Sequence, residues 1–501
     1  MGAQGVSRSE VARGAGLAGL ARAGALIEAL SQPLFTWLFG LAGYGLYVVL
    51  WGAINLLANI LGLSLNAALQ RVVPTARDEE EAHGAVKFAL IAAVLPSVLV
   101  AVLIAAGSER LASLISVAPE DRAALPMTIA LFAPALPLWV FVEVATSAVR
   151  ARRAFGPEIR LRILWEQVAR IGFALAFFAF AFGSTGLVAA HLCSLTLTAV
   201  LCVPLLRKHY GLRLLLRAPI PAALGRGLLA SGAALLPAAL ARRMLVDAPP
   251  IVLNLILPGT RGAVAAALFE IGRKISTIPL VVRQAFLYVM APLSSAQAQA
   301  DRTQIAPLYN FASRVSTALV VPLSGLLIFG GADILSVYRP EAASALPLLT
   351  LLVAARAAEA VVGPATPIVE MTGHRILPLL NSLMGAGLWI ILVWLLVPSL
   401  GPLGMGIAVS AATILISYAA TLELRISDGL SPFDRRLGAG LAIGLIGIAL
   451  MAAVEAAAGG PVRFGCLLLL WAGTTWLALR HGLARGDREA FGGLSRKLRL
   501  V

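Results

Sequence analysis

Apolar segments recur along the whole chain and are separated by short polar stretches. A helix rises 1.5 Å per residue, so about 20 apolar residues cross a hydrocarbon layer of about 30 Å. The pattern predicts an all-α polytopic membrane protein. Its fourteen predicted spans are residues 14–39, 43–69, 85–106, 125–149, 163–182, 185–206, 227–257, 262–290, 308–331, 345–370, 377–397, 402–424, 437–457 and 462–480.

The first apolar segment is too long for the core of a cleavable signal peptide and leads directly into the second. We therefore expect it to remain as a membrane helix. The three cysteines lie inside or at the ends of apolar segments, so the sequence indicates neither a disulfide framework nor a metal cluster. They are Cys193, Cys202 and Cys466.

Composition agrees with this interpretation. Hydrophobic residues make up 59% of the chain and charged residues 13%, with a mean hydropathy of +0.89. Soluble domains contain about 45–50% apolar and about 25% charged residues. The net charge of +15 would suit nucleic-acid binding only if the basic residues lay on a soluble face. They lie instead in short loops, so we expect no nucleic-acid partner.

The loops divide into two sets with very different basic content. One set, which includes both termini, carries 27 Lys and Arg residues, and the alternate set carries 5. By the positive-inside rule the basic set faces the cytoplasm. The sequence thus predicts a multi-pass protein of the bacterial inner membrane with both termini cytoplasmic.

Four glycine or proline landmarks recur at nearly constant separation, which indicates an internal duplication. The pairs are Gly45 with Gly262, Pro74 with Pro292, Gly156 with Gly373, and Gly183 with Gly401. Because each copy holds an even number of helices, the repeat is parallel, with its axis along the membrane normal. We expect an N-terminal lobe at 1–210, a C-terminal lobe at 211–430, and two additional helices with a basic tail at 431–501.

Eight basic residues fall within the predicted spans. Each opposes insertion by about 2.5–3.5 kcal/mol at a helix centre unless it is paired or hydrated. They are Arg22, Arg170, Arg242, Arg243, Arg273, Lys274, Arg283 and Arg356.

Acids at helical spacing provide partners for part of this set. Glu166 can pair with Arg170, Asp247 with Arg243, Glu270 with Arg273 or Lys274, and Glu359 with Arg356. Arg22, Arg242, Arg283 and one of Arg273 or Lys274 have no such acid. We interpret these as lining a water-filled cavity between the lobes, where Arg would favour a phosphate-bearing anion.

Three further features have both a functional and a structural interpretation. Asn55, Asn59, Asn66 and Gln70 share one helical stripe, which suits either hydrogen bonds to sugar or diphosphate, or contacts that join helices. Three prolines, Pro237, Pro249 and Pro250, should bend or interrupt the seventh span, which suits either a hinge or an ordinary proline kink of a membrane helix. His191 is alone in an apolar span and is interpreted as a packing residue rather than a proton site.

Motifs for catalysis are missing from the sequence. It has no phosphate-binding loop of the type G-x-x-x-x-G-K-[ST], no H-E-x-x-H and no G-x-S-x-G. The loops predicted to be outside are too short for a soluble catalytic domain. We therefore expect a transporter without a cofactor or a bound metal rather than an enzyme.

Residues 35–74 resemble the first helical hairpin of the multidrug/oligosaccharidyl-lipid/polysaccharide exporter superfamily. The match is to its polysaccharide-flippase branch, the exporters of O-antigen and exopolysaccharide units. It is carried by Gly40, by the Gly43, Tyr44, Gly45 turn, by the Leu61, Gly62, Leu63 step and by Arg71. A second, similar segment closes the eighth span at Tyr288, Ala291, Pro292 and Ser294.

The resemblance implies two six-helix lobes around a central cavity, alternating access, and an undecaprenyl-diphosphate-linked oligosaccharide as substrate. It also implies basic residues that line the cavity, for which Arg22, Arg242, Arg273, Lys274 and Arg283 occupy suitable positions. Ile60 departs from the pattern, because relatives often have an acid before the Leu-Gly-Leu step. This departure weakens any transfer of cation coupling through that site.

The hypothesis from the sequence is a flippase that moves a lipid-linked anionic oligosaccharide across the inner membrane. Its partners would be the bilayer, a polysaccharide polymerase and glycosyltransferases. One alternative is a peptidoglycan lipid-precursor flippase, which also has fourteen helices. Others are a drug and cation antiporter, a membrane glycan polymerase or ligase, and a scaffold for assembly.

Overall fold

The computed structural model describes residues 8–152, 154, 156, 159–279, 305–371, 376–489 and 499. These residues form helices and their connections, without a β-strand in any of the ranges just given. The chain divides into two compact units, Met1–Ala267 and Leu268–Val501. Each unit is described by itself, and helix α12 (Gly259–Ser276) runs from the first into the second.

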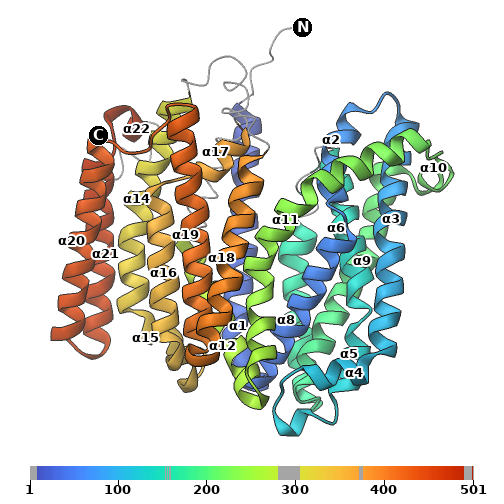
Figure 1. The fold of residues 1–501 in the computed structure, drawn as a ribbon, viewed down its shortest axis with the longest axis horizontal. Coiled ribbons are helices and arrows are strands. Elements are labelled where there is room, and N and C mark those ends of the chain that lie inside the picture. The colour runs from blue at the N-terminus through green and yellow to red at the C-terminus, as the bar shows by residue number, and fades with distance from the viewer. Residues whose placement is uncertain are drawn as a thin grey trace. The chain divides into compact units, whose positions relative to one another are not determined.

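The first unit is built of long helices joined by short helical turns (Figure 1). In chain order they are α1 (Arg8–Leu61), α2 (Leu65–Val72), η1 (Val73–Thr75), α3 (Glu79–Ala106), α4 (Ser108–Leu114), η2 (Pro119–Asp121), α5 (Leu125–Phe132), α6 (Ala135–Ala151), the π-helical η3 (Ile159–Trp165), α8 (Glu166–Ala179), α9 (Thr185–Tyr210), α10 (Leu212–Arg217) and α11 (Ala222–Ile256).

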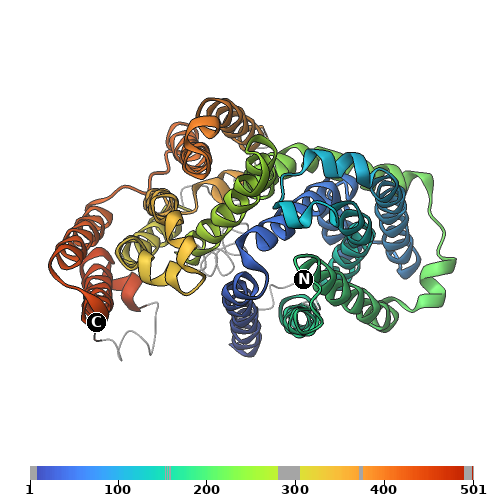
Figure 2. The ribbon, with the colours of Figure 1, turned by 90° about the horizontal axis from the view of Figure 1, so that it is seen from below.

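The second unit repeats this kind of organisation and adds a C-terminal hairpin. Its elements are α14 (Ile305–Phe329), α15 (Gly331–Ser336), η5 (Pro340–Ala345), α16 (Leu346–Val361), α17 (Ala365–Met371), α18 (Leu377–Leu400), α19 (Pro402–Ser427), α20 (Arg435–Ala457), α21 (Gly460–Gly482) and α22 (Arg485–Glu489). Figures 1 and 2 both show α18 and α19 side by side, as their mutual contacts require.

Each of the fourteen predicted spans overlaps a described helix, and the predicted fold class is confirmed. Eleven of the helices in the described part of the chain are long and apolar enough to cross a membrane. The other predicted spans correspond to the N-terminal half of α1, to η3 with α8, and to α12, whose segment continues outside the described residues. The protein is a multi-pass helical membrane protein.

Helix α1 is two helices that meet at Gly40. Its 54 residues would make a rod of about 81 Å if they were straight. Gly40 instead has φ 74° and ψ 167°, outside the helical region, and glycine adopts such a conformation at little cost. The predicted boundary between the first two spans, residues 39–43, is confirmed at this turn.

The second predicted span, 43–69, is not one continuous helix. Leu63 and Ser64 have φ values of 48° and 52°, and α2 begins only at Leu65. The left-handed conformation costs a non-glycine residue about 1–2 kcal/mol, so packing must hold it. Gly232 of α11 supplies that packing, because a side chain there would lie 2.2 Å from the Leu63 carbonyl oxygen.

Helix α11 does not break at its prolines. It runs without interruption through Pro237, Pro249 and Pro250, so the predicted interruption is wrong, although Figure 1 shows the helix curving along its length. Both prolines of the second pair are buried, and the helix packs against α1 and α2. Contacts with neighbouring helices can hold a membrane helix together where proline removes a backbone hydrogen bond.

Left-handed glycines follow the predicted duplication. Gly183 and Gly401, one of the predicted pairs, have φ values of 59° and 54°. Two pairs that the sequence analysis did not use behave alike. Gly211 and Gly429 follow α9 and α19 with φ values of 63° and 68°, and Gly40 and Gly259 have φ values of 74° and 59°.

The order of elements repeats in the same way. A long helix, a short helix and a 3₁₀ turn precede the next span in both units: α3, α4 and η2 in the first, and α14, α15 and η5 in the second. The helices α9 and α19, which begin after Gly183 and Gly401, have 26 residues each. Pro292 and Gly373, the second members of two predicted pairs, lie outside the described residues.

Two predicted landmarks, Gly45 and Gly262, lie next to one another in space. A Cβ atom at Gly45 would lie 1.9 Å from the carbonyl oxygen of Ala263, and one at Gly262 would lie 2.2 Å from the Leu257 carbonyl. Helices can approach as closely as at Gly45 only where a side chain is missing. The second half of α1 therefore packs directly on the start of α12 at Gly45, and Gly262 lets the connection at Leu257 pass close to α12.

The hairpin of α20 and α21 packs through small residues and joins α14. A Cβ atom at Gly482 would lie 2.8 Å from the Cα of Gly440, and one at Gly447 would lie 2.5 Å from the Thr474 side chain. Leu326 of α14 packs with Met451 of α20 and with α21. The additional helices 431–501 are thus attached to the first long helix of the second unit.

Ion pairs hold this hairpin at both ends. Arg314 of α14 donates from Nη1 to Asp487 (2.7 Å) and from Nε to Asp434 (2.9 Å). Asp434 also caps α20 by accepting from the Leu437 amide at 2.7 Å. At the other end, Arg463 pairs with Asp333 at 2.5 Å and with Glu455 at 2.9 Å.

We expect this attachment to weaken in acid and on removal of the Asp434 charge. Desolvation raises the pKa of Asp434, but hydrogen bonds from Arg314 and from the Leu437 amide outweigh it and lower the pKa below its usual value. The stabilisation is present above the unfolded pKa of about 3.9 and is lost as the pH falls through the folded pKa. Asp434→Asn should cost about 1–3 kcal/mol at neutral pH. Hydrogen exchange of the α20 backbone amides measures this loss of stability. Asp428→Asn is the control and should leave the exchange unchanged.

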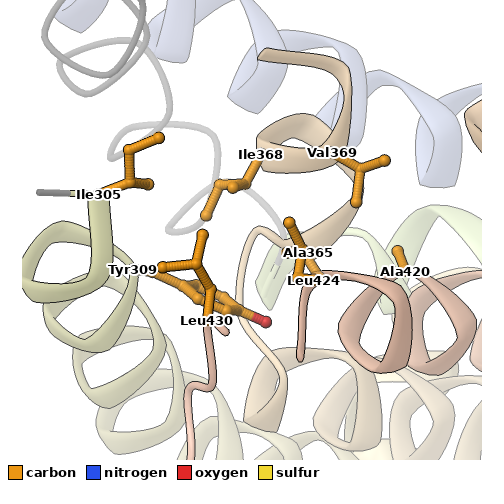
Figure 3. Close-up of a cluster of buried hydrophobic side chains, with 8 residues drawn as sticks. All are labelled: Ile305, Tyr309, Ala365, Ile368, Val369, Ala420, Leu424 and Leu430. Carbon is orange, nitrogen blue, oxygen red and sulfur yellow. The ribbon is translucent and has the colours of Figure 1, made fainter. Parts of the chain in front are cut away.

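The apolar core of the second unit closes the end where α14 starts (Figure 3). Tyr309 is fully buried there and donates a hydrogen bond to the Val362 carbonyl at 3.0 Å. The remaining side chains come from α14, α17, α19 and the loop after α19: Ile305, Ala365, Ile368, Val369, Ala420, Leu424 and Leu430. This cluster fixes α17 between α14 and α19.

Candidate functional site

The basic residues of α12 gather around a single acid. Arg273 donates to both carboxylate oxygens of Glu270, at 2.8 and 2.6 Å, and Lys274 Nζ lies 4.0 Å from Glu270 Oε1. The side chains are 16%, 9% and 26% exposed for Arg273, Glu270 and Lys274. One carboxylate against two cations leaves this turn with net positive charge.

The expectation that one of these two cations has no acid is therefore wrong. Positions i+3 and i+4 from Glu270 lie on the same helical face, and a carboxylate has two oxygens to share. The predicted pairing of Glu270 is confirmed, and it is bidentate with Arg273.

Helix α11 carries a second group with the same balance of charge. Arg243 Nη1 lies 3.4 Å from Asp247 Oδ2, which confirms the predicted pairing, while Arg242 is exposed on the surface of the first unit. As on α12, two cations stand beside one acid on this turn, and α11 is long and apolar enough to cross a membrane.

Two of the predicted cavity residues cannot be located by their side chains. Arg22 lies in the N-terminal half of α1, in the part of the helix whose side chains the structure does not describe. Arg283 lies outside the described residues altogether. Their roles stay predictions from the sequence.

The predicted amide stripe is divided by the left-handed residues at 63 and 64. Asn55 and Asn59 belong to α1, where Asn59 Nδ2 donates to the Asn55 carbonyl at 2.8 Å. Asn66 belongs to α2, and its carbonyl accepts hydrogen bonds from Ser147 Oγ at 2.5 Å and from Gln70 Nε2 at 3.2 Å. The Asn66 side-chain oxygen accepts from the adjacent Ala67 amide at 2.8 Å, and Gln70 Nε2 lies 3.2 Å from Ser147 Oγ. Of the stripe's side chains, Gln70 thus favours the alternative in which the amides join helices, here α2 to α6.

A buried polar cluster in the first unit was only partly visible in the sequence. Arg170 donates to Glu166 at 2.6 Å, as predicted, and also lies 3.0 Å from His191 Nε2 and 3.3 Å from the Tyr47 hydroxyl. Glu166, Arg170 and His191 are 3%, 6% and 0% exposed. Three different helices, α1, α8 and α9, supply these side chains.

His191 is packed mainly by aromatic rings. Its ring centroid lies 4.1 Å from that of Trp51 and 5.8 Å from that of Phe132. Its Nδ1 atom is buried without a hydrogen-bond partner among the described residues. The interpretation of His191 as a packing residue agrees with its aromatic neighbours. His191 also contacts the guanidinium of Arg170, and the spacing of residues along the sequence did not indicate this contact.

The cluster continues towards η3 through tryptophans. Trp51 lies 5.0 Å from Trp139, and the guanidinium carbon of Arg162 lies 4.5 Å above the Trp139 ring. Arg162 also lies 3.6 Å from Glu143. Cation–π contacts and ion pairs of this kind stabilise charge in an apolar interior.

The second unit contains two comparable acidic residues. Glu359 accepts from Arg356 at 2.6 Å, as predicted, and from Ser417 of α19 at 3.4 Å. Glu423 of α19 accepts from Asn381 of α18 at 2.8 Å. These contacts join helices within the unit and neutralise Arg356.

The inventory of charges thus separates into two classes. The pairs on α8, α16 and η3 each join one cation to one acid inside a unit, whereas the turns on α11 and α12 each hold two cations and one acid. Among the described residues no three metal-ligating side chains converge.

Comparison with solved structures gives the fold. The lipid II flippase MurJ in an inward closed conformation superposes with a TM-score of 0.72 over 92% of this chain and 97% of its own, at 12% identity. The fold is that of MurJ and the MATE transporters. An outward-facing MATE multidrug resistance transporter matches with a TM-score of 0.59 over 82% of this chain and 94% of its own, at 16% identity.

The Vibrio cholerae MATE transporter VcmN in its bent form matches with a TM-score of 0.56, over 82% of this chain and 97% of its own, at 14% identity. No protein-family model matches the sequence, and no curated protein does so. The match with MurJ covers 92% of this chain and the matches with the two MATE structures cover 82%. The difference is about 50 of the 501 residues of this chain. This is close to the combined length of α20 and α21, which have 23 residues each.

Proposed function

We propose that the protein is a flippase that moves an undecaprenyl-diphosphate-linked oligosaccharide from the cytoplasmic to the periplasmic leaflet of the inner membrane. The observation that carries this proposal is that four basic residues stand beside two acids on one turn each of α11 and α12: Arg242, Arg243, Arg273 and Lys274 beside Asp247 and Glu270. The fold supports it, because MurJ, the neighbour with a TM-score of 0.72, is named for the flipping of a lipid-linked precursor.

The chemistry of a diphosphate explains the selectivity. Guanidinium groups donate two parallel hydrogen bonds to phosphate oxygens, and a diphosphate presents several such oxygens. A cation at membrane depth that gains such a partner recovers part of its insertion cost. The lipid tail stays in the bilayer while the cations hold the head group.

Transport then requires two states that expose the head group to opposite sides. A ligand shifts an equilibrium between states only by its differential affinity for them, so net movement comes from a gradient of substrate or of an ion. In this proposal the two lobes predicted from the repeat rock around a set of cations. The set comprises the cations of α11 and α12, Arg22 of α1, and Arg283, which lies on the same predicted span as Arg273.

A second candidate is a peptidoglycan lipid-precursor flippase. The specific observation in its favour is the extent of the MurJ match, which reaches 97% of that chain. Both candidates share a polyprenyl diphosphate and differ in the glycan. A glycan polymerase that acts on the exported unit and glycosyltransferases that build it are the partners we propose for the first candidate.

Complementation tests both candidates. The gene is expressed in a strain that lacks its polysaccharide flippase and in a strain depleted of its lipid II flippase. Restored surface polysaccharide in the first strain supports the proposal, and restored growth in the second supports the alternative. No rescue of either strain at normal membrane levels of the protein argues against both.

The cations are tested by Arg242→Ala, Arg273→Ala and Lys274→Ala combined. A charge-assisted hydrogen bond to the substrate is worth about 1.5–3 kcal/mol, so we expect flipping to fall about tenfold or more. The matched control removes three exposed arginines elsewhere, Arg77, Arg425 and Arg435. Immunoblots of the membrane fraction confirm equal amounts, and unchanged flipping in the first variant would refute the assignment of the site.

A further inference from the structure

The segment between the spans α9 and α11 forms a basic surface that the proposed function does not use. We call residues 207–226 the α10 segment. It contains five lysine and arginine residues, and all five are exposed: Arg207, Lys208, Arg213, Arg217 and Arg226. The sequence has no acidic residue between Glu166 and Asp247.

We propose that the α10 segment is a docking surface for anionic phospholipid head groups of the leaflet in which it lies. Both neighbours of the segment, Thr185–Tyr210 and Ala222–Ile256, are candidate membrane spans. The residues that connect them must therefore lie near the bilayer surface. Figure 1 shows α10 at the ends of α3 and α9 where they meet the start of α11.

The orientation of α10 suits such a surface. At 100° per residue, Arg213 and Arg217 share one face and Leu215, which is 4% exposed, occupies the opposite face against the protein. Leu212 and Leu216 share one flank and are 39% and 66% exposed. Basic residues beside exposed leucines are typical of helices that rest in the membrane interface.

Contacts hold α10 in this position. Lys87 of α3 donates from Nζ to the carbonyls of Leu216 and Ala218, at 2.8 and 3.0 Å. Gly84 of α3 allows the Pro219 carbonyl to approach, because a Cβ atom there would lie 2.4 Å from its oxygen. The surface is therefore presented by a fixed element of the first unit.

Two of the three acids of α3, and Asp78 at its N-cap, form contacts away from α10, and the third acid, Glu80, is exposed. On α3, Glu79 forms a bidentate pair with Arg152. Asp78 accepts from the Glu81 amide at 2.7 Å, and Glu81 accepts from the Arg77 amide at 2.7 Å. None of the five basic side chains of the α10 segment forms an ion pair with a described residue. Their charge remains available to an anion from outside the protein.

Anionic phospholipid fits this surface better than a soluble anion does. A soluble phosphate would use the arginines alone, whereas a phospholipid also covers Leu212 and Leu216 with its acyl chains. Juxtamembrane basic residues attract anionic lipid in this way.

Native mass spectrometry of the purified full-length protein in neutral detergent tests the proposal. Phosphatidylglycerol and phosphatidylcholine with the same acyl chains are titrated separately. We expect phosphatidylglycerol to bind about 25-fold more tightly, since Arg213 and Arg217 share the exposed face and each cation near an anionic surface contributes about fivefold. Equal binding of the two lipids would overturn the proposal.

Variants locate the surface. Arg213→Gln, Arg217→Gln and Arg226→Gln combined should reduce phosphatidylglycerol binding about tenfold or more, while phosphatidylcholine binding stays unchanged. The matched control replaces Arg77, Arg425 and Arg435 by glutamine and should bind as the wild type does. A loss of equal size in the control would show that net charge, not this surface, attracts the lipid.

Two further arms distinguish the source of the phosphate. Leu212→Ser with Leu216→Ser should weaken binding of phosphatidylglycerol by several fold, because the acyl chains lose their contact. Inorganic diphosphate at millimolar concentration should leave the lipid bound. Displacement of the lipid by diphosphate, or full binding by the serine variant, would assign the surface to a soluble anion and refute lipid docking.

Discussion

Glu166→Ala is expected to lower the free energy of unfolding by about 3–5 kcal/mol, which is the cost of breaking a buried ion pair from one side. The mutation removes the carboxylate that lies 2.6 Å from the Arg170 guanidinium, where both side chains are almost fully buried. The guanidinium would lose this carboxylate and keep its contacts with the Tyr47 hydroxyl and His191 Nε2.

Thermal unfolding of the purified protein in detergent measures this loss, together with the amount that reaches the membrane. The matched control is Glu489→Ala, which removes the acid of an exposed i, i+4 pair with Arg485 at 3.1 Å. Exposed pairs contribute about 0–1 kcal/mol. Equal stability of the two variants would contradict the importance of the buried pair.

A double variant separates loss of charge balance from loss of packing. Glu166→Gln combined with Arg170→Met removes both charges and keeps most of the volume. Replacing a buried pair as a whole is often neutral or stabilising, so this variant should recover most of the loss. If it is as unstable as Glu166→Ala, the pair acts through specific hydrogen bonds rather than through charge balance.

Gly45→Ala is expected to destabilise the protein by about 1–3 kcal/mol or more, the range for overpacking of a tight interior. The new methyl group would lie 1.9 Å from the Ala263 carbonyl oxygen and 2.7 Å from its carbon. Both are backbone atoms, so no side-chain rotation relieves the overlap. The helix that contains Gly45 and the start of α12 must move apart.

Gly172→Ala provides the matched control. A Cβ atom there has no neighbour within 4 Å, and the residue is exposed on α8. Alanine has a helix propensity about 1 kcal/mol better than glycine, so this variant should be neutral or slightly more stable. Unfolding temperatures of the two variants are compared in one detergent, and a neutral Gly45→Ala would show that the helices tolerate separation there.

The proposed function depends on which cations keep their charge. Three of the four ion pairs predicted from spacing involve one cation and one acid, and they neutralise Arg170, Arg243 and Arg356. The fourth acid, Glu270, is shared by two cations. On this turn of α12 the cations therefore outnumber the acids two to one.

Local pattern along the sequence was sufficient for the fold class, for the approximate places of the helices, for the turns at Gly183 and Gly401 and for the pairs at i+3 and i+4. Apolar length, glycine landmarks such as Gly183 and Gly401, and acids one helical turn from a base all depend on residues close in the chain. The helix geometry converts such spacing into position without any knowledge of the rest of the molecule.

Only the tertiary structure decided the contacts between distant segments. It brought His191 and Tyr47 to Arg170, and it placed Gly232 of α11 against the Leu63 carbonyl so that the second span breaks. It also kept α11 continuous through its prolines. These outcomes depend on which helices pack together, and packing energies are summed over neighbours that no local pattern in the sequence identifies.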